Sequence, residues 1–234
     1  MSRVVQTTPT SAAPAIPLRH QKKAELAYEH LREKIVNGAF SPGQRLTLAD
    51  LSEQCNMSHM PVREALVRLQ REGLIEGEPH KGMRVAGLSL KNARELFAIR
   101  TELEGLAALQ ACAAGDPTLA TDLDSINREF ARAFAARDYS TMGASNRAFH
   151  RRILRSAANS QLERLLEDLW IASLRYRMGY QLIPGRAKGT IAEHKRMVAA
   201  IRTGDPEKAR AAARLHIERA AADLDANFAD LQER

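Results

Sequence analysis

Apolar residues recur at helical spacing along most of this chain, beginning at about residue 21. The first periodic stretch, "KAELAYEHLREKIVNGAF", places Leu26, Leu31 and Ile35 on one stripe and closes at Asn37-Gly38. After the turn residues of "SPGQRL", Thr47 can cap a short helix over "LADLSEQC". Residues 21–55 are therefore predicted to form two helices separated by a turn.

A third helix is predicted over "HMPVREALVRLQREG", and only "NMS" separates it from the second. Ser58 is a favourable N-cap, Pro61 lies in the first turn, where its missing N–H costs little, and Gly73 ends the helix. The segments "LIEGE" and "MRVAGL" flank "PHKG" and predict a two-stranded hairpin. Three helices followed by a hairpin are typical of a winged helix-turn-helix, whose later helix enters the major groove of DNA.

Beyond Gly87 the periodicity is helical throughout. One predicted apolar stripe on the first helix of this region consists of Leu96, Ile99, Leu103 and Leu106. Asp116-Pro117 is predicted to start the next helix, and Gly204-Asp205 to form the turn of a closing helical hairpin. We therefore expect a mainly α protein, with a winged helix-turn-helix over residues 21–87 and an all-helical bundle over residues 88–234.

Composition adds an indication of an anionic partner. The 234 residues include 35 Lys and Arg against 28 Asp and Glu, and the net charge of +7 favours a partner such as DNA. Because this excess is spread over both parts of the chain, charge alone is a weak argument. No run reaches the ~18 apolar residues of a membrane span, and residues 1–20, with three prolines, are expected to be a disordered tail. We expect a cytoplasmic protein without a membrane partner, with Cys55 and Cys112 as buried thiols.

The predicted third helix has one apolar and one polar face. Its inward stripe consists of Val62, Ala65, Leu66 and Leu69. This leaves His59, Met60 and Arg63 on the outward face near the N-terminus, where free N–H groups also favour phosphate. Arg63 could contact a phosphate or a guanine, or it could pair with a carboxylate such as Glu64, and the spacing leaves both open.

The stretch "PGQRLTLADLSEQCNMSHMPVREALVRLQREGLIEGEPHKGMRV" strongly resembles the DNA-binding domain of the GntR family of bacterial transcription regulators. The resemblance rests on "PVREAL", the following "GL" and a wing with a glycine, and it covers most of residues 24–86. It implies DNA contacts from Ser58, His59, Met60 and Arg63 on the recognition helix and from His80, Lys81 and Gly82 at the wing tip. Family members commonly carry Arg-Thr in place of His59-Met60, so the operator sequence does not carry over.

Three of the seven histidines lie beyond residue 87, and each falls on an apolar stripe. His194 and His216 stand at similar distances from the turn at Gly204-Asp205, so an antiparallel hairpin would bring them level. His150 shares a helix face with Asn146, four residues earlier. One such histidine is usually a core residue, but three aimed inward could bind Zn, Ni or Fe, as bundle cores often do. The spacing by itself does not decide between core histidines and a metal site.

The segment from about residue 90 to 230 also looks like the effector-binding FCD domain of the FadR subgroup. Metal-binding members carry Asp-x-x-x-His on one helix and a histidine on each of the last two. By that resemblance, "NRAFH", "AEHKRM" and "RLHIER" supply the ligands of a divalent transition metal, Zn or Ni: Asn146, His150, His194 and His216. Asn146 departs from the usual Asp, and its neutral amide binds a transition metal more weakly.

Arg100 and Glu104 stand at i and i+4 in "AIRTELEGL". They could form an ordinary salt bridge on the helix surface, worth ~0.3–0.5 kcal/mol. By the resemblance, an arginine here points into the effector cavity, where it can hold a carboxylate by a forked contact. Arg175 and Tyr176 in "SLRYRMGYQ" are further candidates for the cavity or its rim, although such a sequence is more often surface.

Together these patterns and resemblances predict a homodimeric transcription repressor that binds a two-half-site operator, a divalent metal and a small carboxylate effector. We expect no enzyme, because no Glu or Asp is an evident general base beside the histidines, and Glu193 is expected on a different face. One alternative is a constitutive DNA-binding protein whose histidines are core residues. Another is a hydrolase with an open position at a three-histidine metal site.

Overall fold

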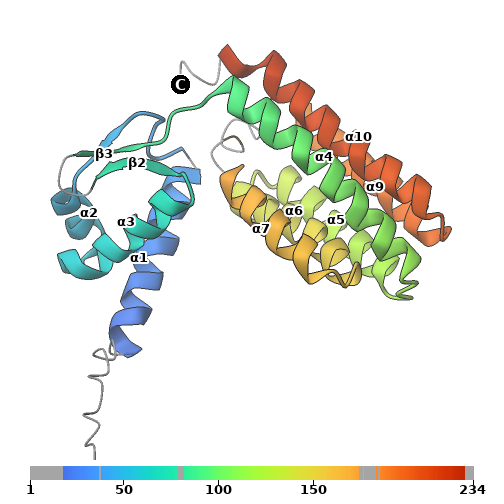
Figure 1. Cartoon of the computed structure of the whole chain (residues 1–234), viewed down its shortest axis with the longest axis horizontal. Helices are drawn as coiled ribbons and strands as arrows, with labels where there is room; N and C mark the ends of the chain where they lie inside the picture. Colours follow the sequence, from blue (N-terminus) through green and yellow to red (C-terminus); the bar gives the residue numbers. More distant parts are fainter. Residues whose placement is uncertain are drawn as a thin grey trace, which may run out of the picture.

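The computed structural model describes residues 18–36, 38–78, 82–173, 176, 183 and 185–229. They form an N-terminal part with a small sheet and a helical C-terminal part, joined by extended chain at residues 86–89 (Figure 1). His80, Lys81, Arg175 and the tail before residue 18, which figured in the sequence expectations, lie outside the described residues. None of the helices in the described part of the chain is long and apolar enough to cross a membrane.

The described residues of the N-terminal part form three helices and a three-stranded antiparallel sheet. The helices are α1 (Leu18–Val36), α2 (Leu48–Cys55) and α3 (His59–Arg71), and the strands are β1 (Arg45–Leu46), β2 (Ile75–Glu78) and β3 (Gly82–Val85). The sheet order is β1-β3-β2, with Leu46 opposite Met83 and Ile75 opposite Val85. The prediction of a two-stranded hairpin therefore missed β1, because two residues are too short to show a strand period.

The core of this part confirms the predicted inward face of α3. Its four apolar residues Val62, Ala65, Leu66 and Leu69 are all 2% exposed or less. On α1 the prediction was wrong for Leu26, which is 57% exposed, whereas Ala27 and Tyr28 are buried beside Leu31 and Ile35. The small Ala27 permits close packing of α1 on α3, and this turns Leu26 toward solvent. Thr47 caps α2 as predicted by accepting a hydrogen bond from the backbone N–H of Asp50.

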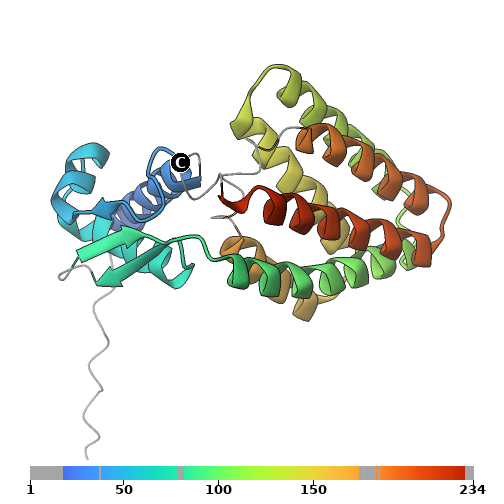
Figure 2. The ribbon, with the colours of Figure 1, turned by 90° about the horizontal axis from the view of Figure 1, so that it is seen from above.

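The C-terminal part is a helical bundle. Its helices within the described residues are α4 (Leu90–Ala113), α5 (Leu119–Ala135), α6 (Tyr139–Ser156), α7 (Ser160–Ala172), α9 (Arg186–Arg202) and α10 (Pro206–Ala226). Figure 2 shows α10 lying along α4 with α9 beside it, and the main apolar core lies between α4, α5, α6, α7, α9 and α10. The start predicted for α5 was two residues early: Thr118 is its N-cap, and Asp116 instead accepts hydrogen bonds from Thr118 and Arg152.

The predicted apolar stripe on α4 is not its buried face. Ile99 is 51% exposed and Leu106 is 37% exposed, whereas Arg100 and Glu104 are buried. The reason is the close approach of α10, which needs small residues: a Cβ added at Gly105 would lie 2.7 Å from a side-chain carbon of Arg214. Packing thus selects a face of small and paired polar residues and leaves larger apolar ones outside.

The closing hairpin has the predicted geometry. Asp205 caps α10 by accepting from the backbone N–H of Lys208, and Pro206 is the first residue of the helix. The apolar stripes of α9 and α10 face each other across this turn, and the ring centroids of His194 and His216 lie 5.0 Å apart. The equal distances from the turn therefore place the two histidines level.

Candidate metal centre and adjoining cavity

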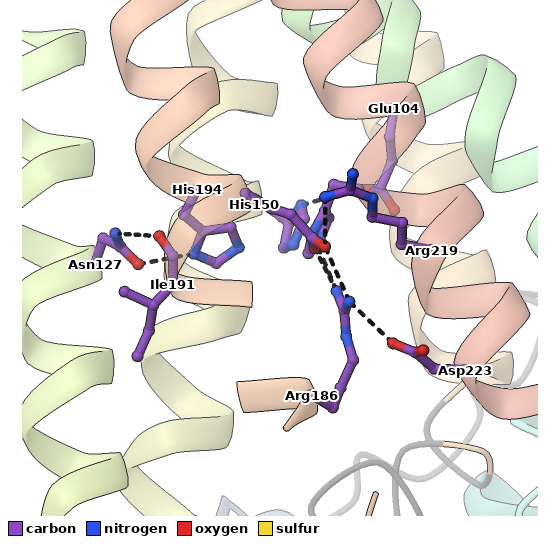
Figure 3. A network of polar contacts seen from close by, with 10 residues as sticks. Glu104, Asn127, His150, Arg186, Ile191, His194, Arg219 and Asp223 are labelled. Carbon is purple, nitrogen blue, oxygen red and sulfur yellow. Dashed lines mark hydrogen bonds and ion pairs between the residues drawn. The ribbon is translucent and has the colours of Figure 1, made fainter. Parts of the chain in front are cut away.

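Three histidines from three helices meet inside the bundle. His150 comes from α6, His194 from α9 and His216 from α10, and they are 8%, 0% and 4% exposed. One ring nitrogen of each lies within 4.8 Å of those of the other two. Figure 3 shows His150 and His194 directed toward the same region between the helices.

Two of the three rings are held by buried carboxylates. Nδ1 of His150 lies 2.8 Å from Glu104 Oε2, and Nδ1 of His216 lies 2.7 Å from Glu193 Oε2. A carboxylate accepts the Nδ1 proton and leaves the lone pair on Nε2, as in the outer shell of many metal-bound histidines. These contacts therefore fix both the orientation and the tautomer of His150 and His216.

The third ring, His194, is held by an amide. Asn127 Nδ2 donates to the carbonyl of Ile191, which leaves its Oδ1 as the acceptor for Nδ1–H of His194 at 3.2 Å. Phe149 stacks on the His194 ring at a centroid distance of 3.8 Å. Nε2 of His194 is fully buried, and no group among the described residues forms a hydrogen bond with it. A buried lone pair without a partner is costly, so this atom is suited to a ligand that the protein itself does not supply.

Glu104 belongs to a buried charge network at the edge of the site. Arg100 Nη2 lies 2.6 Å from Glu104 Oε1, Arg100 Nη1 donates to Ser173 Oγ, and Trp170 Nε1 donates to Glu104. Although burial raises the pKa of the Glu104 carboxyl, Arg100 and His150 hold that pKa well below its usual range. Arg100 and Glu104 thus form a buried ion pair and not a surface salt bridge. Arg100 is also not free to bind an effector with all its donors, because Glu104 and Ser173 engage most of them.

Glu193 forms the matching network on the other side. Arg186 Nη2 lies 2.6 Å from Glu193 Oε2. Its Nη1 lies 3.1 Å from Asp223 Oδ2, a contact drawn in Figure 3. Burial raises the pKa of Glu193, but the hydrogen bonds from His216 and Arg186 outweigh it and lower the pKa to about 2. The expectation that Glu193 lies on a different face from the site was wrong. Along α9 by itself Glu193 and His194 point in different directions, but α10 brings His216 to the side of α9 that carries Glu193.

His194 and His216 are neutral in the folded protein at ordinary pH. Burial lowers the pKa of His216 to about 4 and the pKa of His194 well below its usual value. Neutral imidazole is the form that binds metals. A divalent transition metal fits these three nitrogen donors, their fixed tautomers and the buried Nε2 of His194. For zinc, the metal–nitrogen bonds would be about 2.0–2.1 Å long.

A cavity of about 70 Å³ adjoins the histidines. Its polar lining includes Arg100, Asn146, His150, Ser173, Thr190 and His216, and its apolar lining includes Phe97, Phe130, Met142, Trp170 and Ile217. Asn146 thus lies on the same cavity as His150, as their shared helix face predicts. The structure does not bring Tyr176 to this lining: its hydroxyl donates to the backbone carbonyl of Ser89, at the start of α4.

The residues expected to contact DNA lie at the start of α3. His59 is exposed, Met60 is 56% exposed, and Ser58 is the N-cap residue without a side-chain capping bond. In the described part of the chain, Arg63 has no ion-pair partner, and its Nε has no hydrogen-bond partner. The alternative in which Glu64 engages Arg63 therefore finds no support. Gly82, the described residue of the wing tip, is exposed.

Comparison with known families agrees with both parts of the fold. Residues 23–85 match the model of bacterial regulatory proteins of the gntR family, and residues 95–219 match the FCD domain. Together these matches cover the winged helix-turn-helix and every residue of the histidine cluster.

Individual relatives are transcriptional regulators. The chain is 27% identical to the uncharacterized regulator YdhC of Bacillus subtilis, over 78% of this chain and 82% of YdhC. It is 29% identical to the regulator McbR of Escherichia coli, over 77% and 82% of the two chains. The solved structure of E. coli McbR/YncC superposes with a TM-score of 0.76 at 25% identity, over 88% of this chain and 98% of that one. These relatives are regulators rather than enzymes, and the chain belongs to the GntR family of DNA-binding transcription regulators, with an FCD domain as its C-terminal part.

Proposed function

We propose that this regulator is a repressor of the FadR subgroup whose operator affinity is controlled by a small carboxylate bound beside a divalent metal. The observation that carries the proposal is the convergence of three histidines, with tautomers fixed by Glu104, Glu193 and Asn127, beside a cavity of the FCD domain that His150 and His216 line. Repression is supported by a partial relative, the transcriptional repressor RspR of E. coli, 33% identical over 45% of this chain and 44% of RspR.

His150, His194 and His216 would hold the metal, and Asn146 would add an amide oxygen or hydrogen-bond a metal-bound water. Zn or Ni suits three imidazoles. When bound, the metal supplies a Lewis acid that can take a carboxylate at an open position. The protein's own residues orient the rings, exclude bulk water and shape the cavity that receives the rest of the effector.

Arg100 would assist the effector rather than hold it alone. Its Nε and Nη2 are engaged by Glu104 and its Nη1 by Ser173, so little donor capacity remains. The mixed polar and apolar cavity favours a compact organic carboxylate over a highly charged or long one.

The DNA contacts would come from the exposed start of α3 and from the wing. Arg63, with His59 and Met60, would face the major groove, and Ser58 and the helix N-terminus would approach a phosphate. Gly82 would contribute at the wing tip, together with His80 and Lys81.

A homodimer would present two such helices to an operator with two half-sites. The proposed contact is the outer side of α4 and α7, where Ile99, Leu106 and Leu165 are exposed. Gln110, four residues beyond Leu106, accepts a hydrogen bond from Asn159, the N-cap of α7, so this stripe of α4 runs toward α7. A second copy would cover these side chains about a two-fold axis.

A short chain of contacts leads from the cavity to the link between the two parts. Arg100 donates to Ser173, whose carbonyl accepts from the backbone N–H of Tyr176, and Tyr176 Oη donates to the carbonyl of Ser89. Ser89 ends the extended link at residues 86–89 and caps α4. A ligand that shifts Arg100 can thereby favour one placement of the DNA-binding part, and its effect equals its differential affinity for the two placements.

The test is a mobility-shift assay with the purified protein and a DNA fragment from its own upstream region, at low and physiological salt. We expect a sequence-specific shift that small carboxylates weaken when Zn²⁺ or Ni²⁺ is present. A shift unaffected by any carboxylate, with less than a tenth of an equivalent of bound metal and unchanged melting on metal addition, would favour a constitutive DNA-binding protein.

A further inference from the structure

The acidic side chains around the three histidines are already neutralised by arginines. Glu104 pairs with Arg100 and Glu193 with Arg186, each at 2.6 Å and each buried. Each carboxylate also accepts a hydrogen bond from the Nδ1–H of a histidine. Nδ1 and Nε2 lie on different sides of the imidazole ring. Neither carboxylate is therefore placed to coordinate an ion that the Nε2 atoms hold.

Among the described residues, the candidate ligands of such an ion bring no negative charge to it. An imidazole binds a metal in its neutral form, so the three rings would bring no charge to the ion, and Asn146, half-buried on the same cavity, offers a neutral amide. Within the described residues the Asn146 side chain makes no hydrogen bond, so its oxygen is not already engaged there. A divalent ion at this site would keep its full charge of +2 in a buried environment.

A buried charge without compensation is costly, and an anion beside it removes most of that cost. The cavity next to His150 and His216 has about 70 Å³, several times the roughly 10–15 Å³ that a cavity needs to hold one water molecule. It can therefore accept a small anion next to the ion.

We propose that the divalent metal and a small carboxylate bind this site as a coupled pair, each raising the affinity of the other, because the neutral Asn146 leaves the charge of the ion for the ligand to balance. The proposal rests on the metal site of the proposed function. Since coupling between two ligands is reciprocal, metal occupancy would depend on the effector as much as effector binding depends on the metal. The regulator would then respond to the simultaneous presence of both.

The experiment measures Zn²⁺ affinity of the full-length, metal-free protein by competition with a chromophoric chelator, without acetate and with saturating acetate at equal ionic strength. The affinity of the chelator itself is determined in both buffers. For the wild type we expect acetate to tighten Zn²⁺ binding at least fivefold, the lower end of typical coupling of roughly 5–150-fold.

Two variants at one position separate charge from shape. Asn146→Asp supplies the missing negative charge, so Zn²⁺ should bind more tightly without acetate, and acetate should add less than twofold. Asn146→Ala removes the amide but stays neutral, so the acetate effect should remain at least fivefold. Thermal melting of each metal-free variant reports whether it is folded.

The reverse titration provides an independent readout. Trp170 is the single tryptophan, it lines the cavity, and its Nε1 donates to Glu104. Its emission should therefore follow acetate binding, and acetate affinity should rise with saturating Zn²⁺ by the same factor found for Zn²⁺.

The outcomes separate the coupling from the metal site itself. Equal Zn²⁺ affinity with and without acetate in the wild type would overturn the coupling and leave the metal site standing. An acetate effect as large in Asn146→Asp as in the wild type would overturn it too, since the charge at position 146 would not matter. If the wild type and both variants bound no Zn²⁺ in either buffer, the coupling and the metal site would both be rejected.

Discussion

Glu193 Oε2 lies 2.7 Å from His216 Nδ1, across the hairpin of α9 and α10. Glu193 is the sequence neighbour of His194, so two adjacent residues of α9 act on two different parts of the cluster. His194 supplies a ring, whereas Glu193 orients the ring supplied by α10. Arg186 is the first residue of α9, and its Nη2 donates a hydrogen bond to Glu193. The same Nη2 lies 3.4 Å from His216 Nδ1. We infer that the orientation of His216 depends on the placement of the start of α9.

Metal binding should raise thermal stability through His194. A ligand that binds only the folded state at 100 times its Kd adds about 2.7 kcal/mol, which corresponds to a rise in Tm of roughly 5–11 °C for a chain of this size. Differential scanning calorimetry with Zn²⁺ should show this rise, and excess EDTA should reverse it. His194→Ala should abolish the rise, whereas the exposed His59→Ala should keep it. A full rise in His194→Ala would exclude His194 as a ligand.

The stability of the metal-free protein should fall on acidification in two stages. The pKa of folded His216 is about 4 against an ordinary 6.5, and that of Glu193 is about 2 against 4.5. Both are lowered, so the unfolded state binds more protons in these intervals and the stability present above them is lost as pH falls. Urea unfolding measures the free energy of unfolding at each pH. His216→Asn should flatten its pH dependence between pH 6.5 and 4, and Glu193→Gln should flatten it between pH 4.5 and 2. Unchanged slopes would mean that these pairs do not form in solution.

Arg63 should contribute to operator binding more than other arginines of α3. Arg63→Ala is expected to weaken binding by about 1–3 kcal/mol, the range for a specific side-chain contact to DNA. The matched control is Arg71→Ala, at the exposed C-terminal end of the same helix. Fluorescence anisotropy with a labelled operator, at fixed salt, compares the two. Equal losses in both variants would indicate a general charge effect instead.

Tyr176 should transmit the effector signal without binding the effector. Tyr176→Phe removes the hydrogen bond to the carbonyl of Ser89 and keeps the buried ring, so the fold should be retained. We expect unchanged Zn²⁺ and acetate affinity and unchanged operator affinity without ligand, but at least a twofold smaller effect of acetate on operator binding. A full acetate response in this variant would place the signal elsewhere.

The exposed stripe on α4 and α7 should hold the dimer together. Leu165→Glu places a charge where a second copy would bury an apolar side chain, so sedimentation equilibrium should report monomers at micromolar concentration. Leu26→Glu is the control, because Leu26 is equally exposed but lies on α1 of the DNA-binding part. A dimer of unchanged affinity in Leu165→Glu would rule out this surface as the interface.

The local sequence determined most of the secondary structure and the positions of the three histidines. Caps such as Thr47 and Asp205 act on N–H groups within three residues, and apolar periodicity records which side of a helix is buried, so both are visible in a single chain. The turn at Gly204-Asp205 placed His194 and His216 level for the same reason. The resemblance of "NRAFH" to a family motif then added His150 to the same site.

The tertiary structure alone decided which partners surround those histidines. Glu193 meets His216 across 23 residues and Asn127 meets His194 across 67, and both pairs join different helices. It also decided that α4 buries Arg100 and Glu104 while Ile99 faces outward, because the approach of α10 favours small residues at the contact. Such choices depend on how helices pack against each other, and a periodic pattern along one helix carries no record of its neighbours.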